Sequence, residues 1–259
     1  KQRYWLKKAV DNKLSVAKLQ AAMKSENFEV VPGRMWQLGS HRLMCGDIYN
    51  KDHYAKLVGT TPIDALITDP PYGIDYQPDW KKWDGSKSDF SSIEGDDRPF
   101  SPEPFLDYPT VVLFGANNFS DKLPVGGWVV WDKRLDEDKD GMFGSPFELA
   151  WFKSENTNKN AIMVRVLHGG VVNADSEIGN NEKRFHPTQK PIQVMEKIIN
   201  QTTKLSQVVL DPFGGSGSTL LACEKVGRYC LSMEIDPDYV ATILSRWVNK
   251  YGVQPEVIG

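Results

Sequence analysis

Residues 63–73 read IDALITDPPYG, a short apolar run that ends in a carboxylate, two prolines and an aromatic ring. The apolar part predicts a short buried strand. The two prolines predict a stiff turn after it, because each fixes φ and removes an N–H donor. The carbonyls of Asp69 and Pro70 can then point outward beside the ring of Tyr72. Such a cluster of acceptors suits a flat ring that carries an amino group, although a plain Pro-Pro turn gives the same pattern.

Residues 208–219 read VVLDPFGGSGST and predict a second strand, a glycine-rich turn and the start of a helix. Glycines let the backbone approach a ligand, and the helix N-terminus behind them offers unpaired N–H groups. The turn lacks the lysine of a phosphate loop and the third glycine of the dinucleotide fingerprint, so it predicts a nucleoside site with Asp211 at its mouth. The next expected strand, residues 229–236, ends in Glu234 and Asp236, where a doubly wound fold places the carboxylate that holds ribose hydroxyls.

These two stretches resemble the signature motifs of the S-adenosylmethionine-dependent DNA amino-methyltransferases. Residues 186–191, HPTQKP, resemble a third motif of the same family, and the order of the motifs matches its β-group. The resemblance covers roughly residue 34 to the C-terminus. It implies S-adenosyl-L-methionine as the cofactor and a doubly wound, mostly parallel, seven-stranded α/β sheet of the class I methyltransferase (Rossmann-like) type.

The resemblance also implies a reaction, which is methyl transfer to the N6 amino group of adenine in double-stranded DNA after the base has been flipped out. Asp69 and the Pro70 carbonyl would accept the N–H groups of the amine, and Tyr72 would stack on the base. Catalysis would rest on proximity and electrostatics, without a covalent enzyme intermediate. The expected catalytic residues are Asp69, Pro70, Pro71 and Tyr72.

Residues expected to bind the cofactor come from several parts of the chain. In β-group enzymes a Gly-Asp turn such as that of Asp47 reaches the adenine of the cofactor. Thr188 and Lys190, near an expected helix N-terminus, suit its carboxylate. The full expected set is Asp47, Thr188, Lys190, Asp211, Pro212, Phe213, Gly214, Gly215, Ser216, Gly217, Glu234 and Asp236. Residues 115–119, which follow another expected strand, should also lie at the ligand crevice.

Composition suits one large α/β domain, with 259 residues of which 40% are hydrophobic and 25% charged. The sequence shows no apolar run near the roughly 20 residues of a membrane helix and no signal peptide, and its three cysteines form no Cys-x-x-Cys pair. These features predict a cytoplasmic protein with reduced thiols and no metal. The net charge of −3 weighs mildly against a nucleic-acid partner, whereas local Lys and Arg clusters could form a basic face.

The expected organisation is an N-terminal helical arm at residues 1–30 and a methyltransferase catalytic domain at residues 31–259. Within the domain, residues 73–108 predict a mobile loop whose tryptophans and lysines suit a flap over DNA, or are incidental. Residues 153–185 are the candidate target-recognition region, which is short for that task. The chain begins at Lys1 and not at methionine, which suggests processing or a longer parent protein.

Several alternatives stay open at the level of the sequence. The aspartate at the start of the tetrapeptide favours adenine by analogy with the family, while cytosine-N4 methylation is the nearest alternative. Methylation of an RNA or of a protein amide, and a non-catalytic DNA-binding module, are further readings. A homodimer is open because β-group relatives are often dimers. The sequence indicates neither a recognition site nor a partner restriction enzyme.

Overall fold

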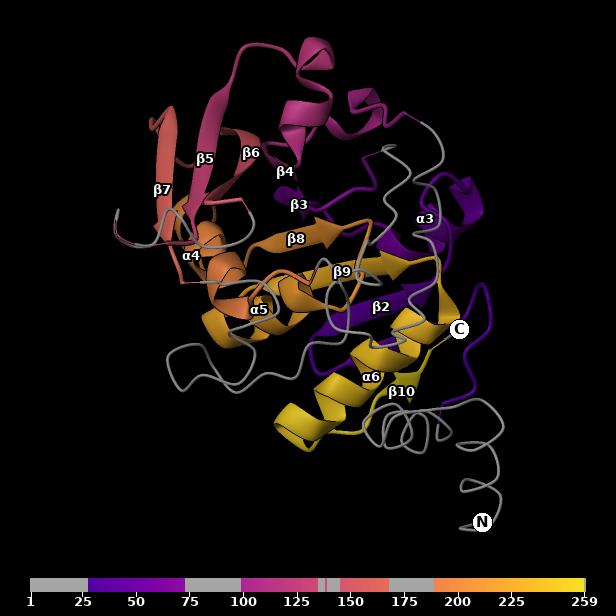
Figure 1. Ribbon diagram of the computed structural model, residues 1–259. Coiled ribbons are helices and arrows are strands. Elements are labelled where there is room, and N and C mark those ends of the chain that lie inside the picture. Colours follow the sequence, from indigo (N-terminus) through magenta and orange to yellow (C-terminus); the bar gives the residue numbers. More distant parts are fainter. Residues whose placement is uncertain (1–27, 73–98, 135–137, 139–144, 168–188, 259) are drawn as a thin grey trace, which may run out of the picture.

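The computed structural model describes residues 28–72, 99–134, 138, 145–167 and 189–258, which build one α/β sheet with its covering helices (Figure 1). The expected helical arm lies outside the described residues except for its last three. Residues 73–98 of the expected loop and residues 168–185 of the candidate target-recognition region also lie outside them.

The sheet has ten strands in the order β10-β1-β2-β9-β8-β3-β4-β6-β5-β7. Five neighbouring pairs are parallel and four are antiparallel, so that only β1 and β6 run against the other eight. The strands are β1 Met35–Leu38, β2 His41–Cys45, β3 Ala65–Thr68, β4 Thr110–Phe114, β5 Gly127–Asp132, β6 Phe147–Ser154, β7 Ala161–Arg165, β8 Val208–Asp211, β9 Tyr229–Glu234 and β10 Glu256–Val257.

The doubly wound, mostly parallel α/β class expected from the sequence is confirmed, but the expected number of seven strands is wrong. Strands β10 and β1 form one edge of the sheet and β7 forms the other. Both residues of β10 are exposed, and β7 buries only alternate residues. Such edge strands carry a weaker apolar signal than central strands, which are covered on both faces.

Among the described residues, four α-helices and three short 3₁₀ turns lie between the strands. The α-helices are α3 Lys51–Val58, α4 Ile192–Thr202, α5 Ser218–Val226 and α6 Pro237–Tyr251, and the 3₁₀ turns are η2 Glu103–Phe105, η3 Ala116–Asn118 and η4 Ser120–Lys122. Helix α6 begins where Asp236 accepts a hydrogen bond from the backbone N–H of Asp238 (2.8 Å) and Pro237 occupies the first helical position. No helix in the described part of the chain is long and apolar enough to cross a membrane.

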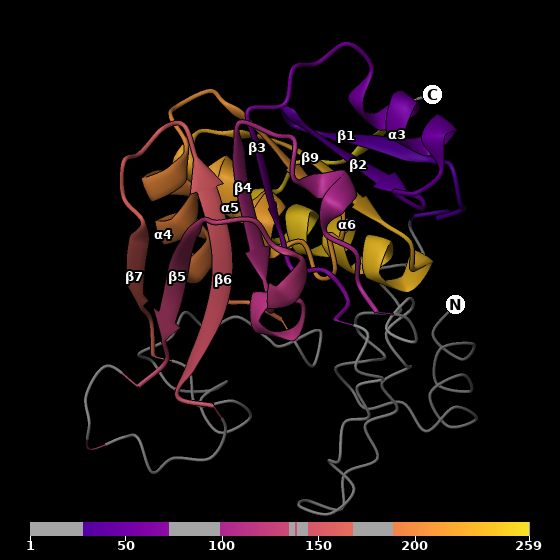
Figure 2. The same cartoon turned by 90° about the horizontal axis from the view of Figure 1, so that it is seen from above.

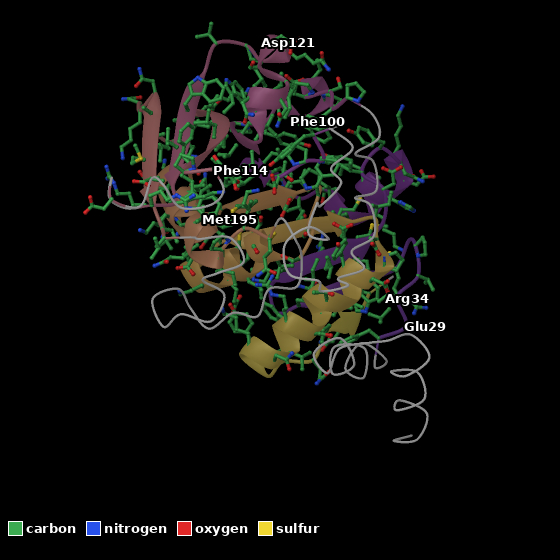
Figure 3. All side chains as sticks on the ribbon, in the orientation of Figure 1. Glu29, Arg34, Phe100, Phe114, Asp121 and Met195 are labelled. Carbon is green, nitrogen blue, oxygen red and sulfur yellow. The ribbon has the colours of Figure 1, made fainter. Side chains whose placement is uncertain are left out.

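Each face of the sheet packs against a different set of helices. On β4, Val112 and Phe114 point to the layer of α4, α5 and α6, while Val111 and Leu113 point to the layer of α3 and the 3₁₀ turns. Figure 2 shows α4, α5 and α6 in a row along the sheet, and Figure 3 labels two side chains of this layer, Phe114 of β4 and Met195 of α4. Because both faces are buried, the central strands are apolar throughout, as the sequence indicated.

The order of the strands brings the sequence motifs together. Strands β2, β9, β8, β3 and β4 are neighbours and parallel, so their carboxyl ends lie at one edge of the sheet. The segments that follow β3 and β8 are the Asp-Pro-Pro-Tyr turn and the glycine-rich loop. In an open α/β sheet this edge is where ligands bind.

Candidate active site

The Asp-Pro-Pro-Tyr turn, residues 69–72, which we call the catalytic turn after the role expected of it, leaves β3 with Pro70 buried and the other three residues partly exposed. The Tyr72 hydroxyl donates a hydrogen bond of 2.5 Å to Oδ1 of Asp69. Burial, together with the charge of Asp69, raises the pKa of Tyr72 well above its ordinary value, so the phenol stays a donor. The turn therefore presents one carboxylate in a fixed orientation.

Gly115, just after β4, makes room for the Tyr72 ring. Its backbone has φ of 65°, and a Cβ built there would lie 1.9 Å from Cε1 of Tyr72. Only glycine adopts this conformation readily and leaves that space open. The expectation that the segment after this strand lies at the crevice agrees with this contact.

The second oxygen of Asp69 takes part in a chain of four alternating charges. Nζ of Lys190 lies 2.5 Å from Oδ2 of Asp69 and 3.2 Å from Oε2 of Glu148. The other oxygen of Glu148 lies 2.5 Å from Nζ of Lys133. We call Asp69, Lys190, Glu148 and Lys133 the charged chain.

Burial and charge act in opposite directions within the charged chain. Burial by itself disfavours the ammonium of Lys190, but Asp69 and Glu148 raise its pKa well above the ordinary value. Burial likewise opposes ionisation of Glu148, but Lys190 and Lys133 lower its pKa to about 2. Lys190 and Glu148 are therefore both charged at neutral pH.

The cofactor loop, residues 211–217, leaves β8 beside the catalytic turn. Thr68, the last residue of β3, donates a hydrogen bond of 2.7 Å to Oδ1 of Asp211. Burial raises the pKa of Asp211 to about 7, although this hydrogen bond favours the ionised form. Thr68 thus connects the two motifs directly.

The glycines of this loop differ in the space around them. A Cβ on Gly214 would lie 2.6 Å from Oγ of Ser232, and one on Gly217 would lie 2.9 Å from the side chain of Ile243. A Cβ on Gly215 would meet nothing within 4 Å. The loop therefore lies tightly against the protein on one side and is open on the other, as close approach of a ligand requires.

Glu234 ties the loop to the end of β9. Its carboxylate accepts hydrogen bonds from the backbone N–H groups of Gly215 (2.6 Å) and Asp236 (2.9 Å). Burial raises the pKa of Glu234 to about 7, against the effect of these hydrogen bonds. Asp236 itself caps α6, so its side chain has a structural role that the sequence-based interpretation as a ligand did not include.

Asp47 reaches the same place from β2. Cys45 pairs with Glu234 across the parallel strands, and the backbone N–H of Gly46 donates to the carbonyl of Glu234 (2.9 Å). Oδ1 of Asp47 accepts a hydrogen bond from the backbone of Tyr49 (2.9 Å). Asp47 and Glu234 are therefore carried by adjoining backbone segments.

An aromatic cluster adjoins the cofactor loop. The ring of Phe213 lies 5.6 Å from that of Phe105, 6.0 Å from that of Phe100 and 6.4 Å from that of Tyr49, measured between centroids. Tyr49 is 58% exposed while the two other partners are buried. Sequence reasoning named only Phe213, because the other rings come from distant segments with no motif of their own.

Of the two expected cofactor ligands near α4, the structure describes only Lys190. Thr188 lies outside the described residues. Lys190 precedes α4, whose N-cap position is Pro191, and its backbone carbonyl accepts a hydrogen bond from Oγ of Ser218 (2.7 Å). Its ammonium contacts Asp69 and Glu148, and the expected contact with a cofactor carboxylate stays a prediction.

Sequence reasoning missed the roles of Glu148, Lys133 and Thr68, and it placed Gly115 at the crevice without predicting its contact with Tyr72. A charged residue near the start of an apolar strand was the available signal for Glu148. It could not be interpreted without the topology, because β6 runs antiparallel to β4 and so begins at the edge where the parallel strands end. Among the described residues, no group of three or more His, Cys, Asp or Glu side chains is placed to hold a metal ion.

The comparison with protein families gives one match over more than half of the chain. A family model for DNA methylases of the N6 and N4 type matches residues 93–245. The matched range includes the cofactor loop and begins after the catalytic turn.

Individual relatives match over shorter lengths. The type II methyltransferase M.HindIII of Haemophilus influenzae is 35% identical over 105 residues, which are 40% of this chain and 32% of the relative. The type II methyltransferase M2.DpnII of Streptococcus pneumoniae is 40% identical over 87 residues, which are 31% of this chain and 32% of the relative. The match thus spans about a third of the length of each of these relatives.

Solved structures show a weaker likeness. The crystal structure of the M1.HpyAVI–SAM complex has a TM-score of 0.48 and 23% identity, over 80% of this chain and 98% of that one. The cytosine-N4-specific PvuII DNA methyltransferase has a TM-score of 0.49 and 17% identity, over 83% of this chain and 89% of that one. Scores below 0.5 support no statement about the substrate.

Proposed function

Because the chain belongs to the N6/N4 DNA methylase family, we propose that it transfers a methyl group from S-adenosyl-L-methionine to the N6 amino group of adenine in double-stranded DNA. The observation that carries this proposal is the junction of the two motifs. Thr68 of β3 bonds to Asp211 of β8 over 2.7 Å, so the acceptor for an amine and the loop for a nucleoside are neighbours. Methyl transfer needs the two reactants held side by side in this way.

The cofactor would lie over the loop of β8, where Gly215 is open to a ligand. Glu234 would accept hydrogen bonds from ribose hydroxyls, and Asp47 would contact the adenine ring. The aromatic cluster around Phe213 offers an apolar wall for that ring. The cofactor supplies a methyl group that is bound to a positively charged sulfur. After the transfer, the rest of the cofactor leaves with that sulfur as a neutral thioether. The residues proposed to hold it remain Asp47, Thr188, Lys190, Asp211, Pro212, Phe213, Gly214, Gly215, Ser216, Gly217, Glu234 and Asp236.

Asp69 would accept an N–H of the target amine. A carboxylate offers about four acceptor sites, and the bonds from Tyr72 and Lys190 leave some of them free. Accepting the N–H raises the electron density on the nitrogen, whose lone pair then forms the new N–C bond. The nitrogen becomes cationic in this step and afterwards loses a proton to Asp69 or to solvent. The negative carboxylate stabilises that developing charge.

A duplex base cannot reach this site without leaving the stack, so the target adenine would be flipped out. The carbonyl of Pro70 would accept the second N–H, and Pro71 would keep the turn stiff. The ring of Tyr72 would stack on the base. Stacking contributes about 1–3 kcal/mol per base, which is comparable with the few kcal/mol that unstacking costs.

The test is to incubate the protein with S-adenosyl-L-methionine and unmethylated genomic DNA, and to identify the nucleosides by mass spectrometry after digestion. We expect N6-methyladenine. N4-methylcytosine would leave the mechanism in place and correct the base. An absence of methylated nucleosides, with cofactor binding shown by calorimetry, would overturn the proposal in favour of an RNA or protein substrate. An Asp69→Ala variant prepared in parallel controls for a contaminating host methylase.

A further inference from the structure

The charged chain contains two residues whose contacts the proposed mechanism does not explain. Lys190 is 8% exposed, and its ammonium contacts both Asp69 and Glu148. The ring of Phe114 lies 5.1 Å from the same nitrogen. An ammonium has three donors, and two of them are directed at carboxylates. The contacts of the Lys190 ammonium therefore suit it to hold the carboxylate of Asp69.

We propose that Lys190 and Glu148 are positioning residues for Asp69, in which Lys190 fixes one carboxylate oxygen and Glu148 holds the ammonium in place and balances its charge. This inference rests on the proposed function and deepens it. For Lys190 it replaces the role of a cofactor ligand, which was proposed above from the sequence, by that of a residue that positions Asp69. It also gives a role to Glu148, which lies in no sequence motif.

The geometry explains why one carboxylate would not be enough. A lysine paired with Asp69 alone would draw electron density from the acceptor and would neutralise it. The reacting amine becomes cationic, so a neutral pair would stabilise it less than a free carboxylate does. Glu148 supplies a second negative charge at 3.2 Å from the ammonium, so that Lys190 is shared between two carboxylates, and Lys133 balances Glu148 from its other side.

Glu148 is itself held from a third direction. Its other oxygen pairs with Lys133, which follows β5, and the backbone N–H of Lys133 donates to the carbonyl of Pro146 (2.9 Å). Strand β5 pairs along its whole length with residues 147–152 of β6, with Trp131 opposite Glu148. The charged chain is thus anchored on rigid strands, which is what precise orientation of a catalytic group requires.

The test compares three variants with a matched control in steady-state methylation assays. Lys190→Met removes the ammonium, Lys190→Arg keeps a positive charge, and Glu148→Gln removes one negative charge at nearly constant shape. The control is Glu196→Gln on α4, which removes an ion pair of 2.7 Å with Lys225 that is remote from the motifs. Calorimetry on each protein gives the dissociation constant for S-adenosyl-L-methionine, and thermal unfolding checks the fold.

We expect Lys190→Met to lower kcat on the order of 100-fold and Glu148→Gln about tenfold, with cofactor affinity unchanged within about threefold. Lys190→Arg should recover part of the loss, and the control should behave as the wild type. A lower kcat with unchanged affinity for S-adenosyl-L-methionine would show that Lys190 positions Asp69 and does not bind the cofactor.

Two results would overturn the inference. One is a tenfold weaker cofactor affinity in Lys190→Met with normal kcat at saturating cofactor, which would return Lys190 to the cofactor site. The other is wild-type kcat in Glu148→Gln. In both cases the wild-type protein still methylates DNA, so the proposed function stands. If the wild-type protein itself methylates no DNA, the proposed function is wrong. Failure of the proposed function is therefore seen in the wild type, and failure of the positioning inference is seen only in the variants.

Discussion

The catalytic turn after β3 and the cofactor loop after β8 lie side by side but are held in different ways. The turn is stiffened by prolines, and its carboxylate is held by Tyr72 of the same turn and by Lys190 from a distant segment of the chain. The loop is held through its backbone, because its glycines lie against β9 and α6 and the N–H of Gly215 donates to the carboxylate of Glu234. The turn should therefore be sensitive to the loss of charged groups, and the loop to added atoms and to the ionisation of carboxylates.

The largest effect should come from the carboxylate itself. Asp69→Ala should lower kcat at least about 1,000-fold, because the acceptor for the target amine is lost. Cofactor affinity should stay within a few-fold of the wild type, since the loop has its own support. Single-turnover methylation and calorimetry on the same preparation measure both quantities. Activity close to that of the wild type would contradict the mechanism.

The next effect tests the space behind the turn. Gly115→Ala should lower kcat on the order of 100-fold, because the new Cβ would displace the Tyr72 ring, and a small misplacement at a reacting centre costs about that much. The matched control is Gly59→Ala, which also has a positive φ but meets nothing within 4 Å. Both variants carry backbone strain of about 1–3 kcal/mol, visible in denaturant unfolding, but only the first should lose activity. Equal kcat in the two would show that the contact does not matter.

A moderate effect should appear in the pH dependence of cofactor binding. The pKa values of Asp211 and Glu234 are raised to about 7, so both carboxyls are partly protonated at neutral pH. A positively charged cofactor with hydroxyl donors favours the ionised forms, so affinity should rise as the pH increases from 6 to 8. The rise is at most about tenfold per pH unit for each group.

Glu234→Gln tests the origin of that dependence. It should weaken cofactor binding about tenfold at pH 8 and flatten the pH profile, while DNA affinity stays unchanged. Calorimetry at pH 6, 7 and 8 on both proteins makes the comparison. A profile equally steep in the variant would show that Glu234 does not titrate on binding.

The smallest effect concerns Asp236, where a structural and a functional role compete. Asp236→Ala should cost about 1 kcal/mol of stability because α6 loses its cap, and Asp236→Asn should keep the cap. Thermal unfolding measures the difference between the two variants. If both bind the cofactor as tightly as the wild type does, Asp236 acts as a cap alone. A tenfold weaker affinity in both would support a cofactor contact.

Most of the fold could be predicted from the chain alone because the central strands are buried on both faces. Strands β3, β4 and β8 were readable as apolar runs that end in polar turns. Helix α4 was readable from its spacing of isoleucine and methionine. The two-residue strand β10 was not predicted, because its exposed residues carry no apolar pattern. The cap at Asp236 was not predicted, although an aspartate followed by proline is typical of a helix start.

The sequence by itself determined the local chemistry of this protein, which is the Asp-Pro-Pro-Tyr turn, the glycine-rich loop and the family to which they belong. These depend on residues adjacent in the chain, so backbone conformation and side-chain type are enough to recognise them. Only the tertiary structure decided the partners of Asp69, namely Lys190 and, beyond it, Glu148, together with the space at Gly115. The partner of a buried charge is whichever group the strand order brings within a few ångströms, and no local pattern carries that order.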